Sequence, residues 1–192
     1  MGSLFDTREV AKSKYSVSST VPVSQLDQFA KIYEEHSRAI FYLALRMMGD
    51  PARAEDITHD VFLKAFKKMG EFRGDANLRT WLYRIAVNCC KNATQSWNQR
   101  NVFGHLHDPT EDAIPGGTDT PLRILELKEL GARIQSALNT LSEESRLLLL
   151  LSADGTLTYE EIGTLGNQSG DAVRGKLYRA RRAFTKVFSK TD

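Results

Sequence analysis

The chain has 192 residues, of which 41% are hydrophobic and 26% are charged. This length suits one medium domain or two small ones, and the apolar content excludes wholesale disorder. The formal net charge of only +2 gives no indication of polyanion binding by the chain as a whole. From Asp171 to the end, however, seven Lys or Arg residues stand against two Asp residues. This local excess of positive charge indicates a nucleic-acid-binding surface near the C-terminus.

The two cysteines, Cys89 and Cys90, are adjacent, which excludes a disulfide framework. No Cys or His residues have the spacing of a zinc site, and no phosphate-binding loop or nucleophile motif occurs. We therefore expect no metal, no cofactor and no enzymatic activity. No apolar run approaches the ~18 residues of a membrane span, and the N-terminus lacks the order of a signal peptide. A cytoplasmic protein without membrane insertion is the resulting prediction.

Composition divides the chain into four segments. The first is polar, rich in Ser and Thr and aperiodic, which is typical of a flexible arm. The third is rich in Gly and Pro and aperiodic over more than 20 residues, which predicts a flexible linker. The other two lack strand alternation, so we predict an all-α fold with an N-terminal helical bundle and a C-terminal helix-turn-helix domain. The predicted boundaries are 1–23 for the arm, 24–97 for the first domain, 98–121 for the linker and 122–192 for the second domain.

In the first domain, apolar residues recur at helical spacing from Ser24 onward. We interpret this stretch as two helices. The second ends at the segment Gly49-Asp50-Pro51, because Gly and Pro both stop helices. A third helix is expected over about residues 52–69, and the block that starts at Phe72 supplies a fourth.

Four helices are predicted in the second domain. Their expected positions are residues 122–139, a helix capped by Ser142 that contains the leucine run 147–151, residues 158–165, and a last helix from Asp171. The leucine run is apolar on all sides, so other elements must surround it. Gly155 ends that helix, and Thr158 and Glu161 form a capping box that starts the next.

The third helix carries two stripes. Ile57, Val61, Ala65 and Met69 form an apolar one; Asp56, Asp60, Leu63 and Lys67 form the other. Two stripes that each contain apolar residues suggest two partners, the domain's own core and a second molecule. A solvated acidic face with a single exposed Leu is the alternative.

The block from Phe72 to Lys91 opens with the turn signal Arg-Gly-Asp and then shows one apolar stripe, at positions 78, 81, 82, 85, 86 and 89. Cys89 is therefore expected to be buried. Helical geometry places the following residues on the other side: Thr80, Tyr83, Arg84, Val87, Asn88 and Lys91. This mixture suits a nucleic-acid single strand, because rings stack on bases, cations follow phosphates and amides contact base edges. An ordinary surface helix with a core Trp is the alternative.

The last helix has an apolar face and a cationic face. The cationic face and its borders comprise Arg174, Gly175, Tyr178, Arg179, Arg181, Arg182 and Lys186. A cationic helix that follows a short helix and a tight turn has the geometry that enters a DNA major groove. Arg can contact a guanine edge with two hydrogen bonds or hold phosphates. A solvated basic helix on a bundle surface is the alternative.

Taken together, the two halves resemble bacterial RNA polymerase sigma factors of the extracytoplasmic-function type, over residues 25–97 and 122–188. The Phe72 block matches the group's Phe-Arg-Gly-Asp, then Thr-Trp-Leu-Tyr-Arg-Ile-Ala from Thr80, then Asn88. The second half matches at Leu141, Arg146, Gly155, Tyr159, Glu160, Glu161, Ile162, Val173, Arg179, Ala180 and Arg181. The chain departs from the group's usual pattern in two places. Gly163 stands where Ala is common, and Asp171-Ala172-Val173-Arg174-Gly175 stands where the group usually has Gly-Thr-Val followed by basic and Ser residues. Asp171 is suited to capping the last helix but repels phosphates.

The resemblance implies a sigma factor that directs core polymerase to promoters by melting the −10 element and reading the −35 element. It assigns core binding to Asp56, Asp60 and Leu63. It assigns −10 contacts to Phe72, Arg73, Asn77, Tyr83, Arg84, Asn88 and Lys91. It assigns −35 contacts to Arg174, Gly175, Tyr178, Arg179, Arg181 and Arg182. The implied partners are the β′ and β subunits of core polymerase, promoter DNA and an anti-sigma factor.

Two other functions remain open from the sequence. A stand-alone helix-turn-helix regulator explains the second domain but gives the Phe72 block no role. A sigma-like decoy that binds polymerase without starting transcription is compatible with the changes at Asp171 and Gly175. We expect the free chain to have two lobes and to need an external inhibitor; packing of the two domains against each other is the alternative.

Overall fold

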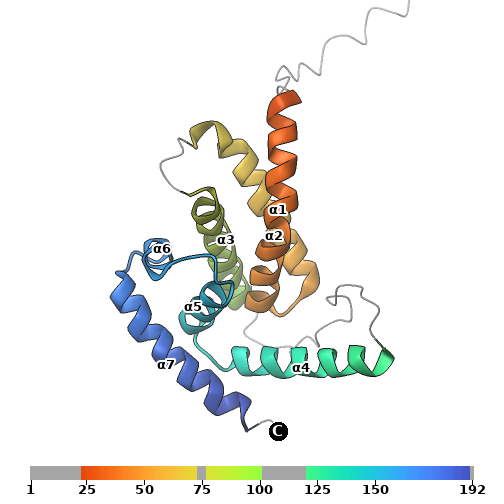
Figure 1. The fold of residues 1–192 in the computed structure, drawn as a ribbon, viewed down its shortest axis with the longest axis vertical. Coiled ribbons are helices and arrows are strands. Elements are labelled where there is room, and N and C mark those ends of the chain that lie inside the picture. Colours follow the sequence, from red (N-terminus) through yellow and green to blue (C-terminus); the bar gives the residue numbers. More distant parts are fainter. Residues whose placement is uncertain (1–22, 73–76, 101–119, 191–192) are drawn as a thin grey trace, which may run out of the picture.

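The computed structural model describes residues 23–72, 77–100 and 120–190, and its regular elements in these ranges are all helical (Figure 1). The all-α prediction is confirmed for these residues. Most of the predicted arm and linker, together with Arg73, lies outside the described residues.

The first half is a bundle of three long helices. They are α1 (Val23–Met48), α2 (Pro51–Lys68) and α3 (Leu78–Arg100), with a short 3-10 turn, η1 (Met69–Glu71), after α2. Each of the three packs against the other two (Figure 1). The interpretation of two helices before Gly49 is wrong, because α1 runs unbroken for 26 residues. Nothing in that stretch interrupts the helical hydrogen bonds until Gly49 takes a φ of +71°, a conformation that favours glycine.

The start of α2 follows from its first residues. Asp50 caps it by accepting a hydrogen bond from the Arg53 amide at 3.1 Å. Pro51 occupies the first helical position, where its missing N–H costs nothing. The predicted boundary between these helices is confirmed to within about a residue.

The second half contains α4 (Pro121–Asn139), α5 (Glu143–Ala153), α6 (Tyr159–Leu165) and α7 (Gly170–Phe188). Ser142 caps α5, and Thr158 and Glu161 form the predicted capping box at α6. The suggestion that Asp171 caps the last helix is wrong: Ser169 accepts the capping hydrogen bond from the Ala172 amide at 3.2 Å. Asp171 lies two residues beyond the capping position, inside the first turn of the helix.

The two halves lie against each other and share one hydrophobic core. In Figure 1, α6 lies beside α3, and α5 contacts α1. Leu82 and Val87 from α3 are fully buried in this core, as are Leu151 and Ile162 from the second half. Within the leucine run, Leu147, Leu148 and Leu151 are buried, and the other two are partly buried. The expectation that this run is surrounded is confirmed.

Candidate nucleic-acid interface

The helix-turn-helix depends on a close contact between α6 and the turn that leads to α7. A Cβ atom added at Gly163 would lie 2.4 Å from the backbone oxygen of Gln168, closer than real atoms approach. A Cβ at Gly170 would lie 2.6 Å from a carboxylate oxygen of Glu160. Gly163 is one of the departures from the usual sigma pattern, and here glycine allows the turn to fold closely over α6.

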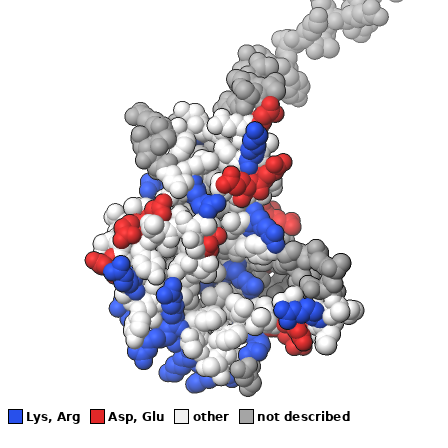
Figure 2. Space-filling model, viewed as in Figure 1, with Lys and Arg blue, Asp and Glu red and all other residues white. Residues whose placement is uncertain are grey.

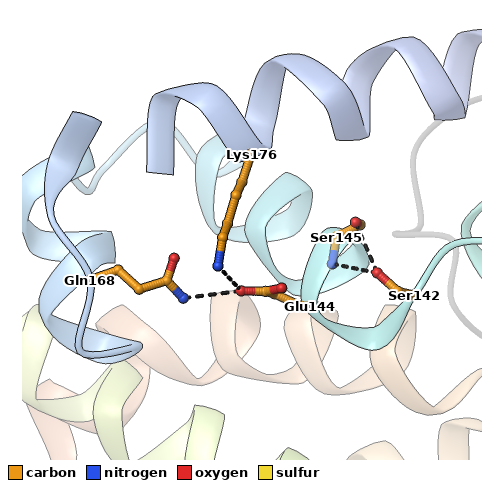
Figure 3. Close-up of polar contacts among 5 residues, drawn as sticks. All are labelled: Ser142, Glu144, Ser145, Gln168 and Lys176. Atoms are coloured by element: carbon orange, nitrogen blue, oxygen red, sulfur yellow. Dashed lines mark hydrogen bonds and ion pairs between the residues drawn. The ribbon is translucent and has the colours of Figure 1, made fainter. Parts of the chain in front are cut away.

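Glu144 links α5 to α7 and to the turn that precedes it (Figure 3). One of its carboxylate oxygens lies 2.5 Å from the Lys176 ammonium nitrogen and accepts a hydrogen bond from the Gln168 side chain at 3.0 Å. The bond from Lys176 and the bond from Gln168 together lower the pKa of Glu144. Three elements meet at this carboxylate: α5, the turn and α7. Sequence reasoning missed this contact, because neither Glu144 nor Lys176 belongs to a recognisable motif.

The cationic face of α7 is exposed as predicted. Val173, Leu177 and Ala180 are buried on the side of α7 that packs against the other helices of the second half. Tyr178, on the cationic face, is 63% exposed. The Arg residues at 174, 179, 181 and 182 are exposed as well. Figure 2 shows Lys and Arg side chains gathered at the lower left of the molecule, over α7. The structure therefore brings the predicted −35 residues together on one accessible surface.

Two details modify that surface. The Arg174 guanidinium lies 2.9 Å from the Asp171 carboxylate, so one cation is already paired. Gly175 is partly buried, and a Cβ there would meet only the end of Arg179 at 4.0 Å. A side chain at position 175 would thus have free space, whereas position 163 has no room for one.

The outer stripe of α2 is accessible. Asp56 and Asp60 are exposed, and Leu63 is 44% exposed. Ile57 and Val61 are buried on the opposite side, so the stripe expected to face the domain's own core does so. A hollow of about 430 Å³ adjoins Asp56, lined by Tyr33, Ser37, Arg38, Phe41, Glu55, Thr58 and His59. The three residues predicted to bind core polymerase are thus exposed, and Asp56 also lines the hollow.

The α3 surface differs from its prediction. Arg84 and Asn88 are exposed, as a binding face requires, and Lys91 is partly buried. The expectation that Tyr83 lies on an open face is wrong in this arrangement, because it is only 3% exposed. Thr80 and Val87 are buried too. The reason is tertiary: the second half packs onto α3 from the side that helical periodicity assigns to solvent.

Polar contacts seal this packing. Thr80 donates a hydrogen bond from its hydroxyl to a Glu161 carboxylate oxygen at 2.9 Å. Burial raises the pKa of the Tyr83 phenol well above its usual value, and the nearby Asp154 carboxylate raises it further. The phenol therefore stays protonated beside the Asp154 carboxylate. An aromatic and a valine outside the first apolar stripe were the sequence signal for a second buried face.

The start of the Phe72 block is partly described. The Phe72 ring is partly buried, with its centroid 5.2 Å from that of Trp81. Asn77 is exposed, and its side chain accepts a hydrogen bond from the Arg79 amide at 3.0 Å. This side-chain contact stabilises the first turn of α3.

The fold is all-α over the described residues, with a helix-turn-helix, an exposed cationic face on α7 and an exposed acidic stripe on α2. Residues 32–100 match the sigma-70 region 2 family, and residues 131–184 match sigma-70 region 4. The chain is 30% identical to the RNA polymerase sigma-H factor of Pseudomonas aeruginosa over 80% of this chain and 82% of that protein. It is 31% identical to the ECF RNA polymerase sigma-E factor of Escherichia coli K12, over 67% of this chain and 70% of that protein.

Solved structures agree on the fold. The sigma factor RpoE of Bartonella quintana, solved with the anti-sigma factor NepR, superposes with a TM-score of 0.68 at 20% identity, covering 85% of this chain and 98% of that one. CnrH, solved with the cytosolic domain of CnrY, superposes with a TM-score of 0.64 at 24% identity, covering 87% of this chain and 91% of that one. The chain belongs to the extracytoplasmic-function family of RNA polymerase sigma factors.

Among the described residues, no helix has both the length and the apolar character that crossing a membrane requires.

Proposed function

We propose that this chain binds core RNA polymerase through α2 and then directs it to promoters through α3 and α7. The observation that supports this proposal is that a single chain of the sigma family has two exposed surfaces of opposite charge. The α2 stripe offers two carboxylates and an apolar side chain, and α7 offers four exposed Arg residues. A stand-alone regulator has no use for the first surface.

Core binding is assigned to Asp56, Asp60 and Leu63. Carboxylates that flank an exposed leucine suit a partner helix with basic and apolar residues, since complementary charge guides docking and apolar burial holds it. The β′ subunit is the proposed partner here, and the β subunit a further contact of the bound chain.

The −10 element is assigned to the start and outer side of α3: Phe72, Arg73, Asn77, Tyr83, Arg84, Asn88 and Lys91. Melting removes bases from the stack at a cost of a few kcal/mol per base. Aromatic rings and amides that capture those bases offset this cost. The −35 element is assigned to α7, which would lie in the major groove with Arg174, Arg179, Arg181 and Arg182 on bases or phosphates.

An anti-sigma factor is the proposed regulator. Its expected binding site overlaps the Asp56, Asp60 and Leu63 surface, so that inhibitor and β′ compete. A cytoplasmic location belongs to the same proposal, since the polymerase it serves is there. Neither assignment depends on enzymatic activity of the chain.

Transcription in vitro with core polymerase and a promoter library tests this function. The expected result is transcription from a subset of promoters only when chain and core are both present. Tight, sequence-specific duplex binding by the chain alone, unaffected by core, would support the stand-alone regulator. Core binding without transcripts from any promoter would support the decoy.

A further inference from the structure

Helix α7 carries a single acidic residue, and that residue lies where DNA is expected to bind. Asp171 is in the first turn of α7, and its side chain is 89% exposed. A helix that enters a major groove contacts bases with its N-terminal residues, so this carboxylate would face DNA. It repels phosphates and so weakens binding to every sequence. The helix does not need it as a cap, because Ser169 accepts that hydrogen bond from the Ala172 amide.

Asp171 pairs with Arg174, which lies one turn further along α7. The Nη1 atom of Arg174 lies 2.9 Å from a carboxylate oxygen of Asp171. The guanidinium carbon of Arg174 also lies 5.8 Å from the centre of the Tyr159 ring, within the range of a cation–π contact. Tyr159 belongs to α6 and packs against the hydrophobic core. Two contacts from two helices thus hold the Arg174 side chain in place, although it is 64% exposed.

Other arginines on the same face have neutral partners. Arg181 donates a hydrogen bond to the Ser152 hydroxyl at 2.9 Å, and the guanidinium carbon of Arg182 lies 5.8 Å from the centre of the Tyr178 ring. Their positive charge stays available to attract the phosphates of any sequence. The charge of Arg174 is balanced by its carboxylate partner, so the pair adds little to this general attraction. A charge-balanced guanidinium that is held in place suits a base edge better than the DNA backbone.

The hydrogen-bonding capacity of Arg174 identifies the base. A guanidinium has five N–H donors, and the bond to Asp171 leaves others free. Guanine presents two acceptors in the major groove, O6 and N7, and one Arg side chain can bond both. Holding Arg174 in one orientation favours this contact, because less side-chain freedom is lost on binding. To reach a phosphate instead, Arg174 would have to leave Asp171, whose carboxylate repels that same phosphate.

We propose that Asp171 is a positioning residue that sets promoter selectivity: it directs Arg174 onto a guanine at one position of the −35 element and weakens binding to sequences without that guanine. The inference rests on the function proposed above. Asp171 acts through Arg174 and does not itself contact the guanine. It lowers the affinity for DNA in general and increases the difference in affinity between matching and non-matching promoters, and this difference is what specificity measures.

Transcription by core polymerase with the full chain, on a promoter library randomised over the −35 element, tests the pair. For the wild type we expect guanine to be preferred about tenfold at one position. Asp171→Ala and Arg174→Ala should each reduce this preference to about twofold at that same position and leave the other positions unchanged. The double variant should lose no more preference there than Arg174→Ala alone, because Asp171 acts through Arg174.

Glu126→Ala is the matched control. It removes the carboxylate of another pair with the same spacing, between Glu126 and Arg123 on α4, outside the proposed DNA surfaces. This variant should keep the base preferences of the wild type. A wild type that transcribed without a guanine preference, or an Asp171→Ala variant that kept the preference or lost it evenly across the −35 element, would overturn the inference. A wild type that gave no transcripts from any promoter would contradict the proposed function instead.

Binding to a short labelled duplex of random sequence, at low salt, separates this role from simple stabilisation of α7. A carboxylate in the first turn also interacts favourably with the helix dipole. If that were its whole role, removing it would not strengthen binding through loss of helix stability. We expect the full-length Asp171→Ala chain to bind the random duplex about threefold more tightly than the wild type, since a group that repels phosphates is gone. Equal or weaker binding would count against the inference.

Discussion

Two helices of this protein carry aromatic and cationic residues on the side away from their main apolar stripe, and they differ in what covers that side. On α7 the side faces solvent, with Tyr178 63% exposed. On α3 the side faces another part of the chain, with Tyr83 3% exposed. The difference arises because α7 lies at the edge of the molecule, whereas α3 lies between α1 and α2 on one side and α6 on the other (Figure 1). Chemical character alone therefore does not tell whether a face is open.

The strongest prediction concerns the glycine that lets the turn fold over α6. Gly163→Ala places a Cβ 2.4 Å from a backbone oxygen, which cannot move aside as a flexible side chain can. We expect a loss of about 3 kcal/mol in the free energy of unfolding, measured by urea denaturation. Gly175→Ala is the control: space there is open, and alanine in a helix should add up to about 1 kcal/mol. Equal stability of the two variants would show that the turn relaxes away from α6.

The next prediction separates the arginines of the open face. Arg179→Ala should weaken binding to a −35 duplex by about 2 kcal/mol, because it removes an exposed cation from the centre of that face. Arg174→Ala should cost less, since Arg174 already pairs with Asp171 at 2.9 Å. Fluorescence anisotropy at several salt concentrations measures both. A smaller salt slope with uniform loss indicates a phosphate contact, and a loss restricted to one base position indicates base reading. Normal binding by both variants would contradict the α7 assignment.

The third prediction concerns the outer stripe of α2, where core polymerase is proposed to bind. Asp60→Arg should weaken binding to core polymerase about tenfold, because a reversed charge repels a basic partner. The fold should persist, since Asp60 is exposed and its ion pair with Lys64, at 3.9 Å, is a surface pair worth little. A pull-down with the β′ subunit measures the effect. Glu55→Arg makes the same charge change on α2 outside the stripe and serves as the control. An equal loss of binding in this variant would show that overall charge, and not a specific contact of Asp60, causes the effect.

The smallest expected effect concerns the carboxylate that orients α7. The pKa of Glu144 is lowered in the folded chain, first by its bond with Lys176. A lowered pKa contributes stability that is present above the unfolded value of 4.5 and is lost as pH falls through the folded value. Since Glu144 is about half exposed, the effect should stay below ~1 kcal/mol. Thermal unfolding should show a steeper loss of stability below pH ~4.5 for the wild type than for Glu144→Gln. If the stabilities of the wild type and Glu144→Gln changed with pH in parallel, the Glu144 carboxylate would not contribute to stability in this way.

Local sequence signals placed the helices accurately where caps and breakers are strong. Ser142 and the capping box at Thr158 act within four residues, so their hydrogen bonds do not depend on distant packing. At the start of α7, Ser169 and Asp171 are both suitable caps, and only the backbone shows that Ser169 accepts the bond. The continuity of α1 was missed because interrupted apolar spacing does not require a break in the helix.

By itself, the sequence determined the helical fold, most helix boundaries, the two stripes of α2 and the cationic face of α7. Each depends on interactions within a few residues or on the periodicity of a single helix. Only the tertiary structure decided that Tyr83 and Val87 of α3 are covered, that Glu144 orients α7, and that Gly163 must lack a side chain. These features join residues from separate helices, and a helical wheel shows the sides of one helix without showing what packs against them.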